Sequence, residues 1–269
     1  MHARPKIIAL DVDGTLLNSS HAILPSTKQA LARLASAGHH ILLATARPPK
    51  SVAGIVQQLG IGSAMFIALN GATIVRQNKI IQDLPMDRDS IRQIIEESRR
   101  QGLHANIMAD WDWFVEGASI WCEEEAAIVQ FQPETVPDLL DPALPPAHKI
   151  LVMGETPAIA SFQGWVLTQG LPLSVSLSKP NYCEIVHQGV SKAHALQEVA
   201  QMLSIRAVDI IAFGDGENDM ELIEMAGIGI AMGNSMPKVL AVADLITKSN
   251  DADGIYHALL QLDLISPHT

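Results

Sequence analysis

A continuous apolar run, Ile7–Leu10, ends in two aspartates one residue apart, in the stretch IIALDVDGTLL. Such a run is typical of a strand in a parallel sheet that helices cover on both faces. In a strand, residues i and i+2 point to the same side, so we expect the carboxylates of Asp11 and Asp13 to meet. Because like charges repel at that separation, the pattern indicates a bound cation at the carboxyl end of the strand.

Strand-like and helix-like segments alternate before and after the middle third of the chain. The spacing of Ser26 and Gln29 predicts a capping box at the first helix. The alternation predicts an α/β fold with a doubly wound, parallel, Rossmann-like sheet. We expect strands at 7–10, 39–46, 208–215, 228–232 and 244–249, and a strand followed by a turn at Asn70-Gly71 within 64–75. We expect helices at 23–38, 48–60, 217–227, 234–243 and 254–262.

The middle of the chain has a different pattern. It contains a proline-rich stretch (133–146), a Trp-rich patch (111–114) and a short run with strand alternation (173–177). These features predict an inserted α+β domain over residues 85–188. Residues 1–84 and 189–269 then form the two halves of one α/β domain.

Composition excludes several classes of protein. The chain has 269 residues and a net charge of −11, which argues against a nucleic-acid backbone as partner. Cys122 and Cys183 are too few for a disulfide framework, and we expect both thiols to be buried. No apolar run is long enough to span a membrane, and the N-terminus reaches a strand too soon for a signal peptide. We therefore expect a cytoplasmic protein.

Four unusual segments fall at predicted strand ends or helix starts. In open α/β sheets, ligands bind beyond the carboxyl ends of the strands, so we expect these segments to converge on one site. A calcium loop is excluded because no segment has both the required glycine and the required glutamate. A dinucleotide fingerprint is excluded because GDGEND lacks the third glycine. The segments are 11–15, 45–47, 191–192 and 214–219.

The same segments resemble a known family. DVDGTLL, ATARP, GVSKAHAL and GDGEND, in this order, resemble the haloacid dehalogenase-like (HAD-like) hydrolases, and among them the Cof-type phosphatases. The resemblance implies a HAD-like hydrolase core with an inserted cap domain of the C2 type at residues 85–188. It also implies a Mg²⁺-dependent phosphoric monoester hydrolase.

The catalytic chemistry can be assigned to two carboxylates. Asp11 is the candidate nucleophile, which would form a phospho-aspartate intermediate, and the family has the same role there. Asp13 is placed to protonate the leaving oxygen and later to deprotonate the attacking water. We assign Mg²⁺ to the carboxylates of Asp11 and Asp215. The main-chain carbonyl of Asp13 is added as a ligand on the family resemblance alone.

Further residues are expected around the phosphate. Their roles are a hydroxyl donor, a positive charge, two backbone N–H donors, a side-chain amide and support for the metal's water shell. Arg47 either contacts substrate or caps the sheet, and both readings stay open. The family often has glycine where Ala46 and Ala193 stand here, which concerns substrate fit and not catalysis. Thr45 is the expected hydroxyl donor, Lys192 the positive charge, and Val12 and Ala46 the backbone N–H donors. Asn218 is the expected side-chain amide, and Asp219 is expected to support the metal's water shell.

The sequence therefore predicts a Mg²⁺-dependent phosphatase that acts on small phosphorylated metabolites, such as sugar phosphates or phosphorylated vitamins. A phosphomutase acting on sugar phosphates is the alternative, and a non-catalytic phosphate-binding module is a third reading. Residues 85–188 are expected to select the leaving group and to close over the site. The sequence identifies neither the substrate nor the oligomeric state.

Overall fold

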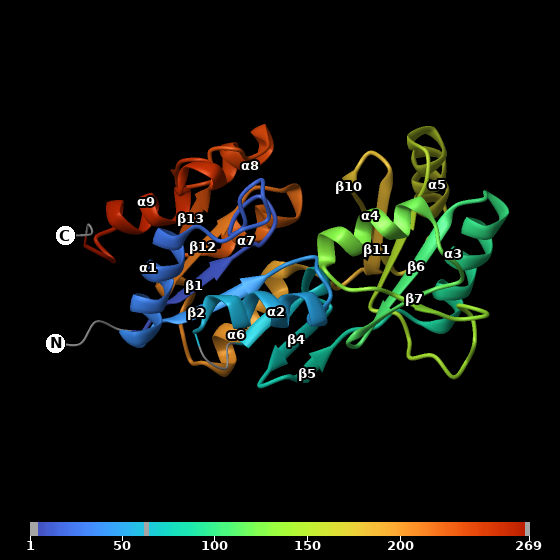
Figure 1. Ribbon diagram of the computed structural model, residues 1–269, viewed down its shortest axis with the longest axis horizontal. Helices are drawn as coiled ribbons and strands as arrows, with labels where there is room; N and C mark the ends of the chain where they lie inside the picture. The colour runs from blue at the N-terminus through green and yellow to red at the C-terminus, as the bar shows by residue number, and fades with distance from the viewer. Residues whose placement is uncertain (1–4, 62–64, 267–269) are drawn as a thin grey trace. The chain divides into compact units, whose positions relative to one another are not determined.

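The computed structural model describes residues 5–61 and 65–266, and the chain divides into two compact units. Unit 1 consists of Met1–Ala46, Val52–Lys79 and Ser191–Thr269. Unit 2 consists of Arg47–Ser51 and Ile80–Val190. In Figure 1 the colour follows the sequence: the first half of unit 1 is blue, most of unit 2 is green to yellow, and the second half of unit 1 is orange to red.

The sheet of unit 1 is mostly parallel. Its strand order is β14-β13-β12-β1-β2-β3-β4-β5 (Figure 1), and β1 pairs in parallel with both β2 and β12. The predicted α/β fold with a parallel sheet is confirmed. β4 instead pairs antiparallel with β3, because only the short turn Leu69–Gly71 joins them and a parallel connection needs a long crossover. The strands are β1 (Ile7–Leu10), β2 (His40–Ala44), β3 (Met65–Ala68), β4 (Thr73–Arg76), β5 (Lys79–Asp83), β12 (Ile210–Gly214), β13 (Ile228–Ala231) and β14 (Leu245–Ile246).

Helices cover this sheet through buried aliphatic side chains. Ile7 and Ala9 of β1 share a core with Leu196 and Val199 of α6, whereas the alternate residues of β1 point to the other face. There α1 packs against β2, and α1 and α9 lie side by side (Figure 1). The helices are α1 (Pro25–Ser36), α2 (Pro49–Leu59), α6 (Lys192–Met202), α7 (Met220–Met225), α8 (Pro237–Val242) and α9 (Gly254–Gln261).

The capping box predicted for the first helix is wrong. Pro25 opens α1, so Leu24 is the N-cap and Ser26 already lies inside the first turn. The Ser26 hydroxyl donates instead to the carboxylate of Asp253, 227 residues away in the chain. Proline is favoured at the first helical position because it has no N–H to satisfy, and here it starts the helix one residue before the predicted cap.

Unit 2 is an α+β unit with a six-stranded sheet of order β10-β11-β9-β6-β7-β8. Its core is formed by aliphatic and aromatic side chains, among them Ile94 of α3, Ile150 of β9 and Phe162 of α5. The thiols of Cys122 and Cys183 are buried as predicted, and burial raises the pKa of each. The elements are α3 (Arg88–Arg100), α4 (Ile120–Val129), α5 (Thr156–Thr168), β6 (His104–Ala109), β7 (Asp112–Val115), β8 (Glu134–Thr135), β9 (Lys149–Met153), β10 (Leu173–Lys179) and β11 (Tyr182–His187).

Strand register in unit 1 brings three chain segments to one edge of the sheet. Leu10, the last residue of β1, is paired with Leu43 of β2 and Phe213 of β12. Because all three strands are parallel, the residues that follow them leave the sheet together. Asp11, Thr45 and Asp215 therefore emerge at the same edge.

Candidate active site

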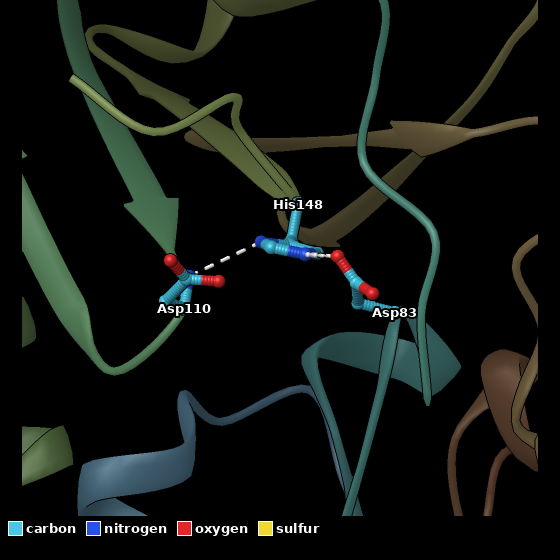
Figure 2. Close-up of side chains that lie close together, drawn as sticks. All are labelled: Asp83, Asp110 and His148. Carbon is cyan, nitrogen blue, oxygen red and sulfur yellow. Dashed lines mark hydrogen bonds and ion pairs between the residues drawn. The ribbon is translucent and has the colours of Figure 1, made fainter. Parts of the chain in front are cut away.

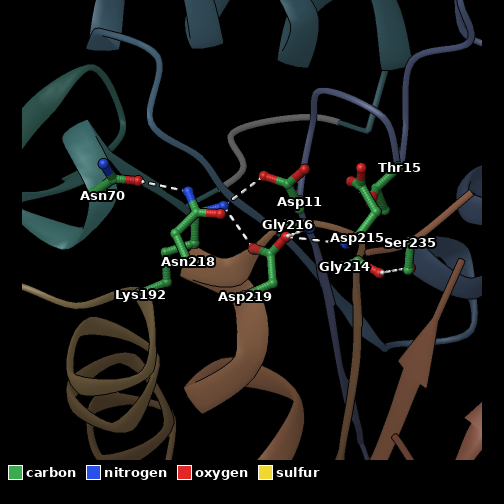
Figure 3. Close-up of polar contacts among 10 residues, drawn as sticks. All are labelled: Asp11, Thr15, Asn70, Lys192, Gly214, Asp215, Gly216, Asn218, Asp219 and Ser235. Atoms are coloured by element: carbon green, nitrogen blue, oxygen red, sulfur yellow. Dashed lines mark hydrogen bonds and ion pairs between the residues drawn. The ribbon is translucent and has the colours of Figure 1, made fainter. Parts of the chain in front are cut away.

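The centre of the site is the ammonium group of Lys192, the first residue of α6. Its Nζ lies 2.6 Å from Oδ1 of Asp11 and 2.6 Å from Oδ1 of Asp219 (Figure 3). The side chains of Lys192 and Asp219 are each 1 % exposed, and that of Asp11 is 7 % exposed. Ser191 caps α6 by accepting from the N–H of His194, which fixes where the helix begins.

Asp219 is held by three donors. Its Oδ2 accepts the backbone N–H groups of Asp215 and Gly216, at 3.1 and 3.0 Å, while Oδ1 accepts from Lys192. Both carboxylate oxygens are thus engaged by the protein itself. This arrangement fits a supporting role for Asp219 better than a direct role as metal ligand.

The carboxylate of Asp215 is oriented from the loop that follows β1. The Thr15 hydroxyl donates to its Oδ1 at 2.8 Å, across 200 residues of sequence (Figure 3). Gly14 has a φ of +79°, and a Cβ at that position would lie 2.3 Å from Oδ2 of Asp215. Only glycine suits both the backbone conformation and the close approach. Asp11 and Asp13 themselves lie beyond the end of β1. Their positions are therefore set by the turn that follows β1, and not by the alternation of side chains along a strand.

Burial and mutual repulsion shift the charges of the site. Burial, then repulsion from Asp219, raises the pKa of Asp11 well above its ordinary value, although Lys192 opposes the shift. Burial also raises the pKa of Asp215 to about 6, against the hydrogen bond from Thr15. Burial alone would lower the pKa of Lys192, but the carboxylates of Asp11 and Asp219 outweigh it and raise that pKa. The negative charge of the carboxylates of Asp11, Asp215 and Asp219 is therefore greater than the single positive charge of Lys192 can balance.

This excess of buried carboxylate fits a divalent cation. Carboxylate oxygens of Asp11, Asp215 and Asp219 lie within 4.8 Å of one another. Hard cations such as Mg²⁺ take oxygen ligands, and a bound dication would offset the burial and mutual repulsion that raise the pKa of Asp11 and Asp215. Since Asp219 already accepts three hydrogen bonds from the protein, Asp11 and Asp215 are the carboxylates best placed to hold such an ion.

Asn218 is held by a residue that the sequence indicated only as part of a turn. Nδ2 of Asn218 donates to Oδ1 of Asn70 at 3.0 Å (Figure 3). Asn70 has a φ of 60°, in the left-handed region that asparagine tolerates. The neighbouring Gly71 lies against the backbone of α6, because a Cβ there would be 2.3 Å from the carbonyl oxygen of Ser191. The turn after β3 therefore supports both Asn218 and the start of α6.

The remaining predicted residues lie in the loops after β1 and β2. Val12 is fully buried, Thr45 is 1 % exposed, and Ala46 is partly exposed. The Thr45 carbonyl accepts from the N–H of Asn70 at 2.9 Å, which joins the loop after β2 to the turn after β3. Arg47 is buried and donates to the Ser51 hydroxyl at 3.2 Å. Asp13 is exposed at the surface of its turn.

Three residues of the site have no assigned role in the sequence analysis: Thr15, Asn70 and Asn234. Each is a small polar residue in a loop, where such residues are common for turn formation alone. The sequence carried one usable signal, since Thr15 belongs to the same DVDGT segment as Asp11. Asn70 and Asn234 had no signal that separates a turn residue from a site residue.

A second group of possible ligands, Asp83, Asp110 and His148, lies within unit 2 (Figure 2). The backbone N–H of Asp110 donates to Nδ1 of His148 at 3.1 Å. A backbone N–H can only donate, so Nδ1 carries no proton and Nε2 is the protonated nitrogen, facing Oδ2 of Asp83 at 3.2 Å. Both ring nitrogens are thereby used, and His148, the residue before β9, links the last residue of β5 to the residue after β6.

The chain is similar to known proteins both in sequence and in fold. The model of the haloacid dehalogenase-like hydrolase family matches residues 8–259. A Bacillus subtilis protein named "Putative phosphatase YkrA" is 32% identical over 97% of this chain and 98% of its own length. The 5-amino-6-(5-phospho-D-ribitylamino)uracil phosphatase YitU of the same organism is 29% identical over 95% of this chain and 96% of its own. A haloacid dehalogenase-like hydrolase from Bacteroides thetaiotaomicron has a TM-score of 0.90 at 27% identity, covering 96% of this chain and all of that one.

Within residues 5–61 and 65–266, no helix is both long and apolar enough to cross a bilayer.

Proposed function

The chain belongs to the haloacid dehalogenase-like hydrolase family, and from this premise we propose that it is a Mg²⁺-dependent phosphatase of small phosphate esters. The observation that carries the proposal is the convergence of Asp11, Asp215 and Asp219 around Lys192. The phosphatase names of the relatives YkrA and YitU support it.

Asp11 is the proposed nucleophile. Lys192 holds one of its carboxylate oxygens at 2.6 Å, which limits the rotation of the side chain. Attack on phosphorus forms an O–P bond to Asp11 as the bond from phosphorus to the leaving oxygen breaks. The positive charge of Lys192 stabilises the negative charge that gathers on the transferring phosphoryl group.

Asp13 is the proposed general acid and base. It lies two residues after the nucleophile, and its side chain is exposed, so it can exchange protons with water. It donates a proton to the leaving oxygen in the first step. In the second step it accepts a proton from the water that attacks the phospho-aspartate, which returns Asp11 to its starting form.

Asp11 and Asp215 are proposed to hold Mg²⁺, with the main-chain carbonyl of Asp13 as a further ligand. When bound, the ion supplies positive charge that allows an anionic carboxylate to approach an anionic phosphate. Thr15 keeps the carboxylate of Asp215 turned toward the site. Asp219 holds Lys192 in place and stays hydrogen-bonded to the loop.

The phosphate itself is proposed to be bound by the side chains of Thr45, Lys192 and Asn218. The backbone N–H groups of Val12 and Ala46 complete this set. Asn218 is oriented for it by Asn70. Selection of the leaving group by residues 85–188, a contact of Arg47 with substrate, and a cytoplasmic location remain predictions from the sequence.

The substrate class is proposed from the sequence motifs and from the name of the relative YitU. Sugar phosphates and phosphorylated vitamins or their precursors present one phosphomonoester on a small polar alcohol, as does the substrate named for YitU. The first experiment is a screen of purified protein against a panel of such esters, with release of inorganic phosphate as the readout. Each assay is run with Mg²⁺ and with a chelator, and release that needs neither Mg²⁺ nor another divalent ion would contradict the metal assignment.

Asp11→Asn tests the mechanism directly. It should abolish hydrolysis of an aryl phosphate while the circular dichroism spectrum stays that of the wild type. Near-normal turnover would refute the nucleophile. In the screen of sugar phosphates, formation of an isomeric sugar phosphate without phosphate release would favour the phosphomutase alternative.

A further inference from the structure

Asn234 lies in the loop between β13 and α8 and joins two other loops through one side chain. Its Nδ2 donates to the carbonyl oxygen of Gly14 at 2.8 Å. Its Oδ1 accepts from the backbone N–H of Asn250 at 2.9 Å. Because a carbonyl can only accept and an N–H can only donate, these two partners fix which end of the amide points toward Gly14.

The same Nδ2 also approaches the carboxylate of Asp215. It lies 3.5 Å from Oδ2, which is a long contact, while Thr15 donates to Oδ1 at 2.8 Å. The two oxygens of Asp215 therefore face donors from two different loops. Since the Cα of Gly14 also packs against this carboxylate, the side chain of Asp215 has little freedom to turn.

Asn250 makes a similar bond nearby and serves as a comparison. Its Nδ2 donates to the carbonyl oxygen of Leu17 at 2.9 Å, in the same loop that carries Gly14. Among the described residues, its side-chain amide bonds to Leu17 and not to Asp215. The two asparagines thus make matched amide-to-carbonyl bonds, and only Asn234 also reaches Asp215.

We propose that Asn234 is a positioning residue that sets the orientation of Asp215 relative to the loop of Asp11, and thereby the affinity of the site for a divalent cation. The proposal rests on the proposed function, in which Asp11 and Asp215 hold the metal. Groups that orient a metal-binding carboxylate change metal affinity typically by about 10- to 100-fold when they are removed. Asn234 does this with a neutral amide, which adds no charge to the site.

The test measures metal binding without substrate. Mn²⁺ is the probe, and its dissociation constant is measured by electron paramagnetic resonance for the wild type, Asn234→Ala and Asn250→Ala. We expect Asn234→Ala to raise the constant about tenfold or more, by the usual effect of such groups. Asn250→Ala keeps the N–H that holds Asn234, so its constant should stay within about twofold of the wild type.

Melting temperatures separate positioning from a structural role. Asn250→Ala loses one amide-to-carbonyl bond, and Asn234→Ala loses one together with the acceptor for the Asn250 N–H. Without metal, both melting temperatures should therefore fall, and that of Asn234→Ala should fall further. An equal rise of the Mn²⁺ constant in both variants would show that the amides only join loops, and would overturn the proposal. An unchanged constant in Asn234→Ala would overturn it as well.

Two further measurements keep the outcome decisive. If Asn234→Ala does not fold, Asn234→Ser takes its place. Its hydroxyl is too short to reach both Gly14 and Asp215, so the Mn²⁺ dissociation constant should rise by the same factor.

Hydrolysis of an aryl phosphate is measured separately. Wild-type protein that binds Mn²⁺ but hydrolyses no ester would contradict the proposed function. The role of Asn234 would still be decided by the Mn²⁺ dissociation constants of the wild type and the two variants. Active protein with equal constants would defeat the inference alone.

Discussion

Nζ of Lys192 lies 2.6 Å from Oδ1 of Asp11, although 181 residues separate them in the chain. Both side chains are buried, and Lys192 also holds the buried carboxylate of Asp219. One cation thus sits between two anions in a place where water screens poorly. The stability of this part of the fold and the chemistry of the site depend on the same charge.

Lys192→Met should destabilise the metal-free protein strongly. Removing the cation leaves the buried carboxylates of Asp11 and Asp219 without a counter-charge, which costs about 3–5 kcal/mol in comparable buried pairs. Urea unfolding at neutral pH in a chelator measures the loss. Lys238→Met is the control, since Lys238 makes an exposed ion pair with Glu217 at 3.0 Å. Exposed pairs contribute about 0–1 kcal/mol, so similar losses in both variants would contradict the prediction.

Divalent cations should stabilise the folded protein. A ligand at 100 times its dissociation constant adds about 2.7 kcal/mol when it binds only the folded state. We expect Mg²⁺ to raise the melting temperature of the wild type and to have little effect on Asp215→Asn. Asp89→Asn, at an exposed position in unit 2, should keep the full response to Mg²⁺. The prediction fails if Asp215→Asn responds as strongly as Asp89→Asn.

Gly71→Ala should impair catalysis more than its backbone strain alone explains. Gly71 has a φ of +107°, and its new Cβ would lie 2.3 Å from the Ser191 carbonyl, so the start of α6 must move and carry Lys192 with it. Small misplacements of catalytic groups cost up to about 100-fold in rate. The measurement is kcat for an aryl phosphate, together with the melting temperature.

Gly38→Ala is the matched control for that experiment. Gly38 also has a positive φ, +92°, but nothing lies within 4 Å of the position of its Cβ. Both variants suffer the cost of a left-handed backbone, which is about 1–2 kcal/mol. Gly38→Ala should therefore lower the melting temperature and leave kcat near that of the wild type. Equal values of kcat in the two variants would show that the close approach to Ser191 has no catalytic role.

Asp87 should make the stability of unit 2 depend on pH at the acidic end. Asp87 is the N-cap of α3 and accepts from the N–H of Ser90 at 2.9 Å and from its hydroxyl at 2.5 Å. These bonds lower the pKa of Asp87 below its ordinary value of 3.8. The stabilisation is therefore complete above the ordinary pKa and is lost as the pH falls through the lowered one.

Asp87→Ala checks that dependence. Loss of an N-cap costs about 0.5–2 kcal/mol, so we expect a difference of that size from the wild type in urea unfolding at pH 7. The difference should shrink as the pH falls below about 4, where protonation weakens the cap in the wild type. A difference that is constant or grows toward low pH would count against the assigned role.

Much of unit 1 follows from local patterns in the sequence. β1, β2 and β12 are short apolar runs, and such runs predict buried strands whatever they pack against. Other local readings were wrong once distant contacts were present. Glu123, Glu124 and Glu125 look alike in the sequence, but Glu125 is buried and its two neighbours are exposed. Met236 is an apolar residue, but it is 47% exposed.

The sequence by itself determined the types of the main elements, the family, and the fact that Asp11, Thr45, Lys192 and Asp215 stand at strand ends or a helix start. These properties depend on residues that are neighbours in the chain. Only the tertiary structure decided that Lys192 bridges Asp11 and Asp219, that Asn70 holds Asn218, and that Asn234 reaches Asp215. Those pairs depend on the register of parallel strands and on where each loop turns. Small polar residues look alike in a loop until folding brings their partners within hydrogen-bonding distance.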